Sequence, residues 1–136
     1  MRRTVIYLFG PIDSCPDPIQ GWRPVASEAL SKYATVFDPA GAAITNRPGQ
    51  EVIELDEFML EHSNVLLGVF EPGSVGTCRE IERAVMLDKP VFAVQIQKSA
   101  SPYYNDERIL VFPDMNNAIS AVIKHLLHGS DVEESG

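Results

Sequence analysis

The most informative segment of the chain is Val65-Leu66-Leu67-Gly68-Val69-Phe70-Glu71-Pro72-Gly73-Ser74-Val75-Gly76-Thr77-Cys78-Arg79-Glu80. Its first six residues are apolar or glycine throughout, which is typical of a strand buried on both faces of a parallel sheet. The glycine-rich segment that follows predicts a turn, and a helix-like pattern comes next. A strand, a glycine-rich turn and a helix start form a ready anion site, because free backbone N–H groups point outward there. The carboxylate of Glu80 inside such a site requires an explanation.

The rest of the chain repeats this alternation of strand and helix. The pattern predicts strands at 4–9, 35–37, 65–70, 91–96 and 109–112, and helices at 23–32, 51–61, 78–87 and 116–127. Such alternation predicts a single-domain, three-layer α/β sandwich: a five-stranded parallel sheet, flavodoxin- or Rossmann-like, with helices on both faces. We expect the domain to span residues 1–128 and residues 129–136 to form an acidic, disordered tail.

Composition limits the classes of partner. The chain has 136 residues and a net charge of −8, which argues against a nucleic-acid polymer as partner but not against a mononucleotide. The two cysteines, Cys15 and Cys78, have no metal-like spacing and suit a reducing compartment. No apolar run is long enough to span a bilayer, and the N-terminus does not have the pattern of a signal peptide. We expect a cytoplasmic protein with no membrane partner, no cofactor and no metal ion.

The predicted helix at 51–61 contains one carboxylate on the wrong face. Successive residues advance roughly 100° around a helix, so Glu51, Glu54, Glu57 and Glu61 share the polar arc. Asp56 falls in the middle of the apolar arc instead. An inward Asp costs free energy unless it is paired or lines a wet cleft. The alternative is a structural Asp that bonds a backbone group or an internal arginine.

Glu80 also points along the buried side of its predicted helix. The pattern Thr77-x-x-Glu80 matches a capping box, in which the glutamate bonds back to the cap residue. A simple cap, however, does not need the Pro-Gly-Ser-Val-Gly segment before it. Two carboxylates that face one pocket can divide acid and nucleophile roles in the cleavage of a glycosidic bond. Tyr7, near the same sheet edge, could hydrogen-bond a carboxylate, or it could be an ordinary core aromatic.

These residues resemble those of the nucleoside 2-deoxyribosyltransferase family and its nucleotide N-glycosidase relatives. The resemblance runs from about Thr4 to Val94 and depends on the order and spacing of several parts. The parts are Ile6-Tyr7-Leu8-Phe9-Gly10-Pro11, Asp56, the run 65–70, Gly76-Thr77-Cys78-Arg79-Glu80-Ile81 with Ala84, and Lys89-Pro90-Val91.

The resemblance implies a role for each matching residue. Glu80 matches the nucleophile that attacks the anomeric carbon of the (deoxy)ribose. Tyr7 matches a tyrosine that hydrogen-bonds and orients that glutamate, and Asp56 matches an aspartate linked to protonation of the leaving base. Family members assemble as homodimers or higher homo-oligomers, often with a neighbour's residues in the pocket. Tyr103, Tyr104 and Asn105 are candidates for such a contribution.

Two positions depart from the family pattern. Most members have Ala-Asp before the third strand, where this chain has Ser63-Asn64, a position of structural rather than catalytic weight. Transferases that act on free nucleosides have an aspartate where this chain has Ser74. Serine there resembles the branch that hydrolyses nucleoside 5′-monophosphates, and a hydroxyl among glycine N–H groups suits a 5′-phosphate. The alternative for Ser74 is a turn residue chosen for local hydrogen bonding.

A substrate would bind across the strand edges, with its base toward Gly10 and the loop after the first strand. Residue type suggests Phe9 or Trp22 for stacking on the base, and Gly73, Ser74 and Gly76 for holding the 5′ end. The sequence thus predicts cleavage of the N-glycosidic bond of a nucleoside 5′-monophosphate through a covalent glycosyl-Glu80 intermediate, with base exchange between free deoxynucleosides as the alternative.

Other classes remain as alternatives. The segment from Pro72 to Glu80 also resembles the Pro-Gly-Gly-x-Gly-Thr-x-x-Glu motif of the cytokinin-activating phosphoribohydrolases, which split a nucleoside monophosphate as well. A non-enzymatic nucleotide sensor would have little use for two inward carboxylates. A receiver-like signalling domain needs an acidic cluster after the first strand, and Gly10-Pro11 supplies none.

Overall fold

The computed structural model describes residues 3–10, 21–39, 49–70, 75–95 and 107–135 of the chain. Its centre is a five-stranded sheet in the order β2-β1-β3-β4-β5, and every neighbouring pair of strands is parallel. The parallel α/β sheet predicted from the sequence is confirmed. The strands are β1 (Val5–Phe9), β2 (Thr35–Phe37), β3 (Val65–Phe70), β4 (Val91–Gln95) and β5 (Ile109–Phe112).

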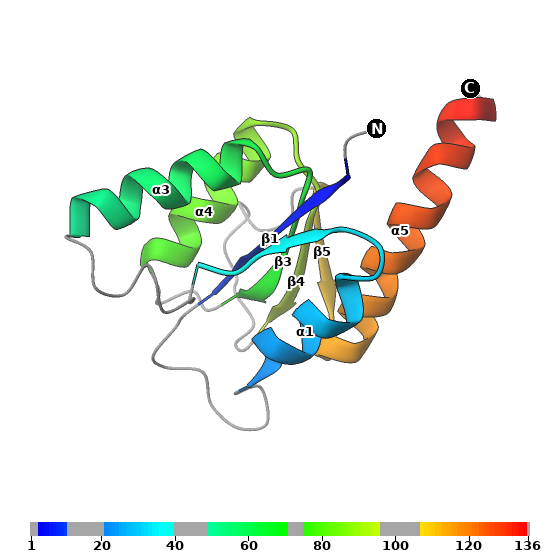
Figure 1. The fold of residues 1–136 in the computed structure, drawn as a ribbon, viewed down its shortest axis with the longest axis horizontal. Helices are drawn as coiled ribbons and strands as arrows, with labels where there is room; N and C mark the ends of the chain where they lie inside the picture. The colour runs from blue at the N-terminus through cyan, green and yellow to red at the C-terminus, as the bar shows by residue number, and fades with distance from the viewer. Residues whose placement is uncertain (1–2, 11–20, 40–48, 71–74, 96–106, 136) are drawn as a thin grey trace.

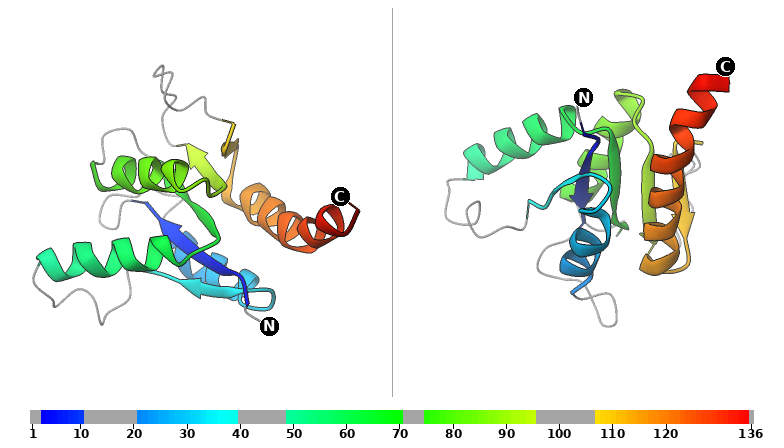
Figure 2. Two further views of the ribbon diagram at one scale, coloured as in Figure 1. Left: turned by 90° about the horizontal axis from the view of Figure 1, so that it is seen from above. Right: turned by 45° about the vertical axis from the view of Figure 1, so that its right-hand side comes forward.

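Helices cover both faces of this sheet (Figures 1 and 2). One face packs against α1 (Trp22–Leu30) and α5 (Met115–Ser135), and the other against α3 (Gly49–Glu61) and α4 (Val75–Met86). The three-layer sandwich is therefore as predicted. No helix within the described part of the chain is both long and apolar enough to cross a lipid bilayer.

The central strands are buried on both faces, which explains their apolar composition. All six residues of β3 are buried. In β1, Ile6 and Leu8 belong to the core under α1 and α5, whereas Tyr7 and Phe9 belong to the core under α3 and α4. Successive side chains of a strand point to opposite faces, so the two cores share the same strands.

Two helices differ from the sequence-based expectation by more than two residues at one end. Helix α4 begins at Val75 instead of Cys78. The backbone N–H groups of the first helical positions have no intrahelical acceptor in any helix. Glycine and a β-branched residue are therefore tolerated there. Helix α5 continues to Ser135, where the sequence predicts a helix end at Leu127 and then a disordered tail. Each added residue continues the backbone hydrogen-bond ladder, and the glutamates in this segment are good helix formers.

Gly68 allows β1 and β3 to approach each other beneath the α3 and α4 layer. It is paired with Phe9 across the two strands. A Cβ atom at Gly68 would lie 2.0 Å from the carbonyl oxygen of Phe9 and 2.7 Å from the Cγ atom of its ring. Both contacts are far inside van der Waals distance, and the first is with backbone that cannot rotate away.

We therefore expect Gly68→Ala to lower the free energy of unfolding by at least about 3 kcal/mol, through overpacking against rigid backbone. Urea unfolding monitored by circular dichroism would measure the change. Gly21→Ala is the matched control, because Gly21 has a φ of +85° but no atom within 4 Å of an added Cβ. That control should lose only about 1 kcal/mol from backbone strain. Equal losses in the two variants would contradict the close approach at Gly68.

Candidate active site

Three polar side chains from three elements converge on the sheet face beneath α3 and α4. Tyr7 comes from β1, Asp56 from α3 and Glu80 from α4. Tyr7 is fully buried, yet its hydroxyl and the Oδ1 atom of Asp56 have no hydrogen-bond partner among the described residues. Unpaired buried polar atoms are rare and costly, and at a cleft they mark groups held for a ligand or a reaction.

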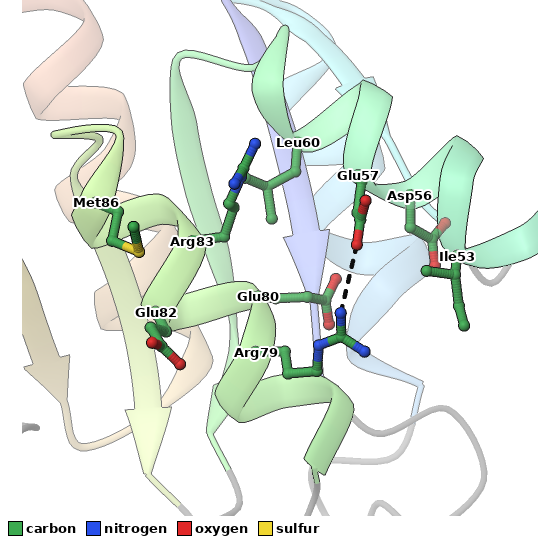
Figure 3. Close-up of a pocket in the computed structure, with 9 residues that line it drawn as sticks. All are labelled: Ile53, Asp56, Glu57, Leu60, Arg79, Glu80, Glu82, Arg83 and Met86. Carbon is green, nitrogen blue, oxygen red and sulfur yellow. Dashed lines mark hydrogen bonds and ion pairs between the residues drawn. The ribbon is translucent and has the colours of Figure 1, made fainter.

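A pocket of about 310 Å³ opens between α3 and α4 above this cluster. Asp56 and Glu80 both line it, and Figure 3 shows the Glu80 carboxylate directed into the space between the two helices. At its rim the two helices are joined by exposed ion pairs, Arg79 with Glu57 at 3.5 Å and Arg83 with Glu61. The pocket is lined by Ile53, Asp56, Glu57, Leu60, Arg79, Glu80, Glu82, Arg83 and Met86.

Asp56 lies where the helical pattern predicts it. Glu51, Glu54, Glu57 and Glu61 are exposed, whereas Asp56 is half-buried and lines the pocket. Burial raises the pKa of its carboxyl to about 6, and the positive charge of Arg23 opposes the rise. The sequence-based alternative is an Asp that bonds an internal arginine or a backbone group. The Oδ1 atom of Asp56 makes no such hydrogen bond within the described part of the chain.

Glu80 is not the second half of a capping box. Because α4 begins at Val75, Thr77 is its third residue and cannot be its N-cap. Glu80 lies instead in the second turn, on the face of α4 that carries buried Ile81 and Ala84. Burial raises the pKa of the Glu80 carboxyl to about 7. The nearby Tyr7 hydroxyl lowers it, the charge of Asp56 raises it further, and Arg23 lowers it.

The Tyr7 hydroxyl stays protonated beside these carboxylates. Burial raises its pKa far above the usual range, and the adjacent negative charge of Glu80 adds to the rise. The hydroxyl is close enough to Glu80 to affect the pKa of both groups, although the pair falls outside strict hydrogen-bond geometry. A protonated phenol can only donate to a carboxylate, so Tyr7 is placed to orient and stabilise ionised Glu80.

Arg23 is a residue of this region that the sequence reasoning missed. It is 8% exposed, at the start of α1. Its guanidinium pairs with Asp38 at 2.7 Å and donates to the carbonyl of Gly10 at 2.9 Å. A signal was available in the sequence: Arg23, Ala26 and Leu30 recur at the spacing of a buried helix face.

The other predicted site residues are not all brought together. Trp22 is buried in the opposite core, between the sheet and α1, and Phe9 is fully buried beneath α3 and α4. Neither side chain is therefore presented at the pocket. Gly10 directly follows β1 and its carbonyl accepts a hydrogen bond from Arg23, and Gly76 is the second residue of α4. The predicted residues that lie outside the described part of the chain are Gly73, Ser74, Tyr103, Tyr104 and Asn105.

Among the described residues, no three His, Cys, Asp or Glu side chains gather into a group that could hold a metal ion. The arrangement of Tyr7, Asp56 and Glu80 supports acid–base and nucleophilic chemistry. It has one carboxylate beside a fixed phenol donor and a second carboxyl group across the same pocket. Titration near neutral pH makes both groups usable as an acid or as a nucleophile.

Burial of Glu80 makes stability depend on pH. Its pKa rises from 4.5 in the unfolded chain to about 7 in the folded one. Below pH 4.5 the carboxyl is protonated in both states, and its contribution to stability is lost as the pH rises through 7. We expect Glu80→Gln to increase the free energy of unfolding at pH 8 by roughly 2–3 kcal/mol and to leave it nearly unchanged at pH 4.

Urea unfolding at the two pH values would measure this difference. Glu28→Gln is the matched control, since Glu28 is exposed on α1. The buried-charge interpretation is wrong if Glu80→Gln gives the same change in stability at both pH values.

No protein-family model matches the sequence, and no curated protein matches it by sequence. Solved structures match its fold over most of their length. A 2-deoxyribosyltransferase from the psychrotolerant bacterium Bacillus psychrosaccharolyticus aligns with a TM-score of 0.66 and 18% identity, over 85% of this chain and 90% of that one. A 2-deoxyribosyltransferase from Leishmania mexicana aligns with a TM-score of 0.66 and 15% identity, over 90% of this chain and 98% of that one.

A Clostridium botulinum CMP N-glycosidase also aligns, with a TM-score of 0.59 and 12% identity, over 88% of this chain and 98% of that one. Identities this low establish a shared fold. The chain therefore has the fold of the 2-deoxyribosyltransferases and of a nucleotide N-glycosidase, which agrees with the resemblance seen in the sequence.

Proposed function

We propose that the protein is an enzyme that cleaves the N-glycosidic bond of a (deoxy)ribonucleoside 5′-monophosphate, and that it belongs to the family of the 2-deoxyribosyltransferases. The observation that carries the proposal is that Asp56 and Glu80 line one pocket, with the buried Tyr7 close enough to affect the pKa of Glu80. The shared fold supports it, because both deoxyribosyltransferases and a CMP N-glycosidase have this architecture. Two inward carboxylates also argue against a simple binder of an anionic nucleotide.

In the proposed mechanism, Glu80 is the nucleophile. Its carboxylate oxygen attacks the anomeric carbon, the bond from that carbon to the base nitrogen breaks, and its electron pair leaves with the base. Asp56 donates a proton to the departing base. Tyr7 donates to Glu80 and fixes the attacking oxygen. Water then attacks the anomeric carbon, the bond from that carbon to the Glu80 oxygen breaks and its electron pair returns to the carboxylate. Asp56 accepts the proton of the water, and (deoxy)ribose 5-phosphate leaves.

The two carboxyl groups supply both functions when they hold one proton between them. Their pKa values lie near 6 for Asp56 and near 7 for Glu80. In a coupled pair these values belong to the pair, and the singly protonated form is most populated between them. One member of that form is a carboxylate and the other is an acid. The higher pKa of Glu80 favours the proton on Glu80 in the free protein, so the proposed roles require the proton to move to Asp56 when a substrate base is bound beside it.

The choice of a nucleotide over a nucleoside depends on Ser74, which directly precedes α4 in the sequence. A serine hydroxyl can donate to a 5′-phosphate, whereas an aspartate in its place would repel one. Gly76 lies at the N-terminal end of α4, where helix N–H groups favour an anion. This part of the proposal is based on the sequence.

The activity can be tested directly by incubating the protein with nucleosides and 5′-monophosphates and detecting free base by chromatography. We expect release from 5′-monophosphates, and Glu80→Ala should lose at least about a thousandfold in kcat/KM, as expected for removal of a nucleophile. Glu28→Gln should keep full activity. Binding of nucleotides without release of base would indicate a sensor, and cleavage by Glu80→Ala at the parental rate would exclude Glu80 as the nucleophile.

The substrate assignment has its own variant. Ser74→Asp should reduce turnover of 5′-monophosphates at least about tenfold more than turnover of nucleosides, through repulsion of the phosphate. A second base added to the reaction separates the two activities, because a transferase would form a new nucleoside and a hydrolase would not. An equal effect of Ser74→Asp on both substrate types would remove the argument for the phosphate.

We expect a bell-shaped dependence of kcat/KM on pH with its maximum between about pH 6 and 7, the pKa values of the pair. Asp56→Asn should lower the rate by about 10²–10⁴-fold and abolish the alkaline limb, because no acid remains to lose its proton. Its acid limb should not move to lower pH, because Asp56 is already protonated and uncharged when Glu80 ionises on that limb. An alkaline limb that persists in Asp56→Asn would show that another group is the acid.

A further inference from the structure

Arg23 joins three segments at the carboxyl edge of the sheet. From the first turn of α1 its guanidinium reaches the carbonyl oxygens of Leu8 at 3.4 Å and Gly10 at 2.9 Å, which flank the end of β1. It also pairs with Asp38, directly after β2, at 2.7 Å. The Arg23 side chain is 10% exposed and that of Asp38 is 28% exposed.

Such a pair is poorly explained as a source of stability alone. Taking an arginine out of water costs several kcal/mol, and a buried ion pair often contributes no more than a well-packed apolar pair would. Its position is informative instead. The two carbonyls that Arg23 binds belong to the residue directly after Tyr7 and to Gly10, so the guanidinium holds the strand end that carries the tyrosine.

We propose that Arg23 is a positioning residue of the candidate active site: it ties the end of β1 to β2 and holds a buried positive charge beside Tyr7, Asp56 and Glu80. The charge favours the ionised form of Glu80, and the hydrogen bonds keep the Tyr7 hydroxyl directed at that carboxylate. The consequence for catalysis rests on the proposed function, whereas the electrostatic effect on Glu80 does not.

The arginines nearest to Glu80 in sequence are poor substitutes for this charge. The side chains of Arg79 and Arg83 are 64% and 47% exposed, and each is paired with a glutamate of α3. Water and these partners screen their charges, whereas a buried charge is screened much less. Arg23 accordingly acts on all three site groups, lowering the pKa of Tyr7, Asp56 and Glu80 against the effect of burial.

The charged and titratable groups around Glu80 come from each element packed against it. Burial and Asp56 favour its protonated form, and Tyr7 and Arg23 favour its ionised form. Among the described residues, Arg23 is thus the one positively charged side chain that shifts the pKa of Glu80. The groups are Tyr7 of β1, Arg23 of α1, Asp38 after β2, Asp56 and Glu57 of α3, and Arg79, Glu82 and Arg83 of α4.

The direct test is a carboxyl carbon NMR titration of the protein labelled with ¹³C at glutamate Cδ, with Glu80→Gln used to assign the Glu80 signal. We expect Arg23→Gln to move the Glu80 midpoint upward by about half a pH unit or more, because a neighbouring positive charge is lost. Arg23→Lys, which keeps the charge, should move it less than half as far. Arg3→Gln removes an exposed arginine that bonds only the Ser31 carbonyl in this structure and should leave the midpoint unchanged.

A second variant covers the case in which Arg23→Gln does not fold. Asp38→Asn removes the negative partner of Arg23 and leaves the guanidinium charge less compensated. We expect the Glu80 midpoint to fall in this variant, opposite in direction to Arg23→Gln. A purely structural salt bridge would give no such opposed shifts, and an unchanged midpoint in folded Arg23→Gln or in Asp38→Asn would overturn the proposal.

The activity readout separates this proposal from the proposed function. With an active parent enzyme, Arg23→Gln should shift the acid limb of kcat/KM upward by the same interval as the NMR midpoint, and Arg23→Lys should restore it. If the parent releases no base from any substrate, the proposed function fails while the NMR shifts still decide the role of Arg23. An acid limb that stays in place while the rate falls would show a structural role only.

Discussion

The candidate active site depends on the placement of one buried carboxyl group, that of Glu80, close to the hydroxyl of Tyr7. Burial holds the Glu80 pKa near 7, against the opposing effects of Tyr7 and Arg23. A carboxylate away from water destabilises a fold unless it is paired, so ordinary packing would exclude it. Active sites keep such groups because a carboxyl group that titrates near neutral pH can act as an acid or as a nucleophile.

The parallel sheet brings the partners of Glu80 together. Every connection returns the chain in the same direction, so the carboxyl ends of β1, β2 and β3 share one edge. Tyr7 is near the end of β1, Arg23 binds the carbonyls after it, and α4 follows β3 with Glu80 in its second turn. Gly68 permits the close approach of β1 and β3 on which this edge is built.

Part of the site could be predicted because local periodicity reports which face of a helix a residue occupies. Asp56 breaks an otherwise amphipathic pattern, and its inward position is confirmed. The start of α4 could not be placed from the same pattern, because first-turn positions tolerate almost any residue. Arg23 was missed since charged residues at a helix start are usually solvated. Trp22 was assigned to the pocket by residue type alone, and it lies in the opposite core.

Apolar strand runs that alternate with amphipathic helices are enough to predict the parallel α/β architecture, and helical periodicity singles out Asp56 and Glu80 as inward carboxylates. Periodicity does not say which of these groups come together. The gathering of Tyr7, Arg23, Asp56 and Glu80 requires the order β2-β1-β3-β4-β5 and the packing of α3 against α4. The physical reason is that periodicity is a local property, whereas burial, which raises the pKa of Glu80, arises only when distant segments exclude water together.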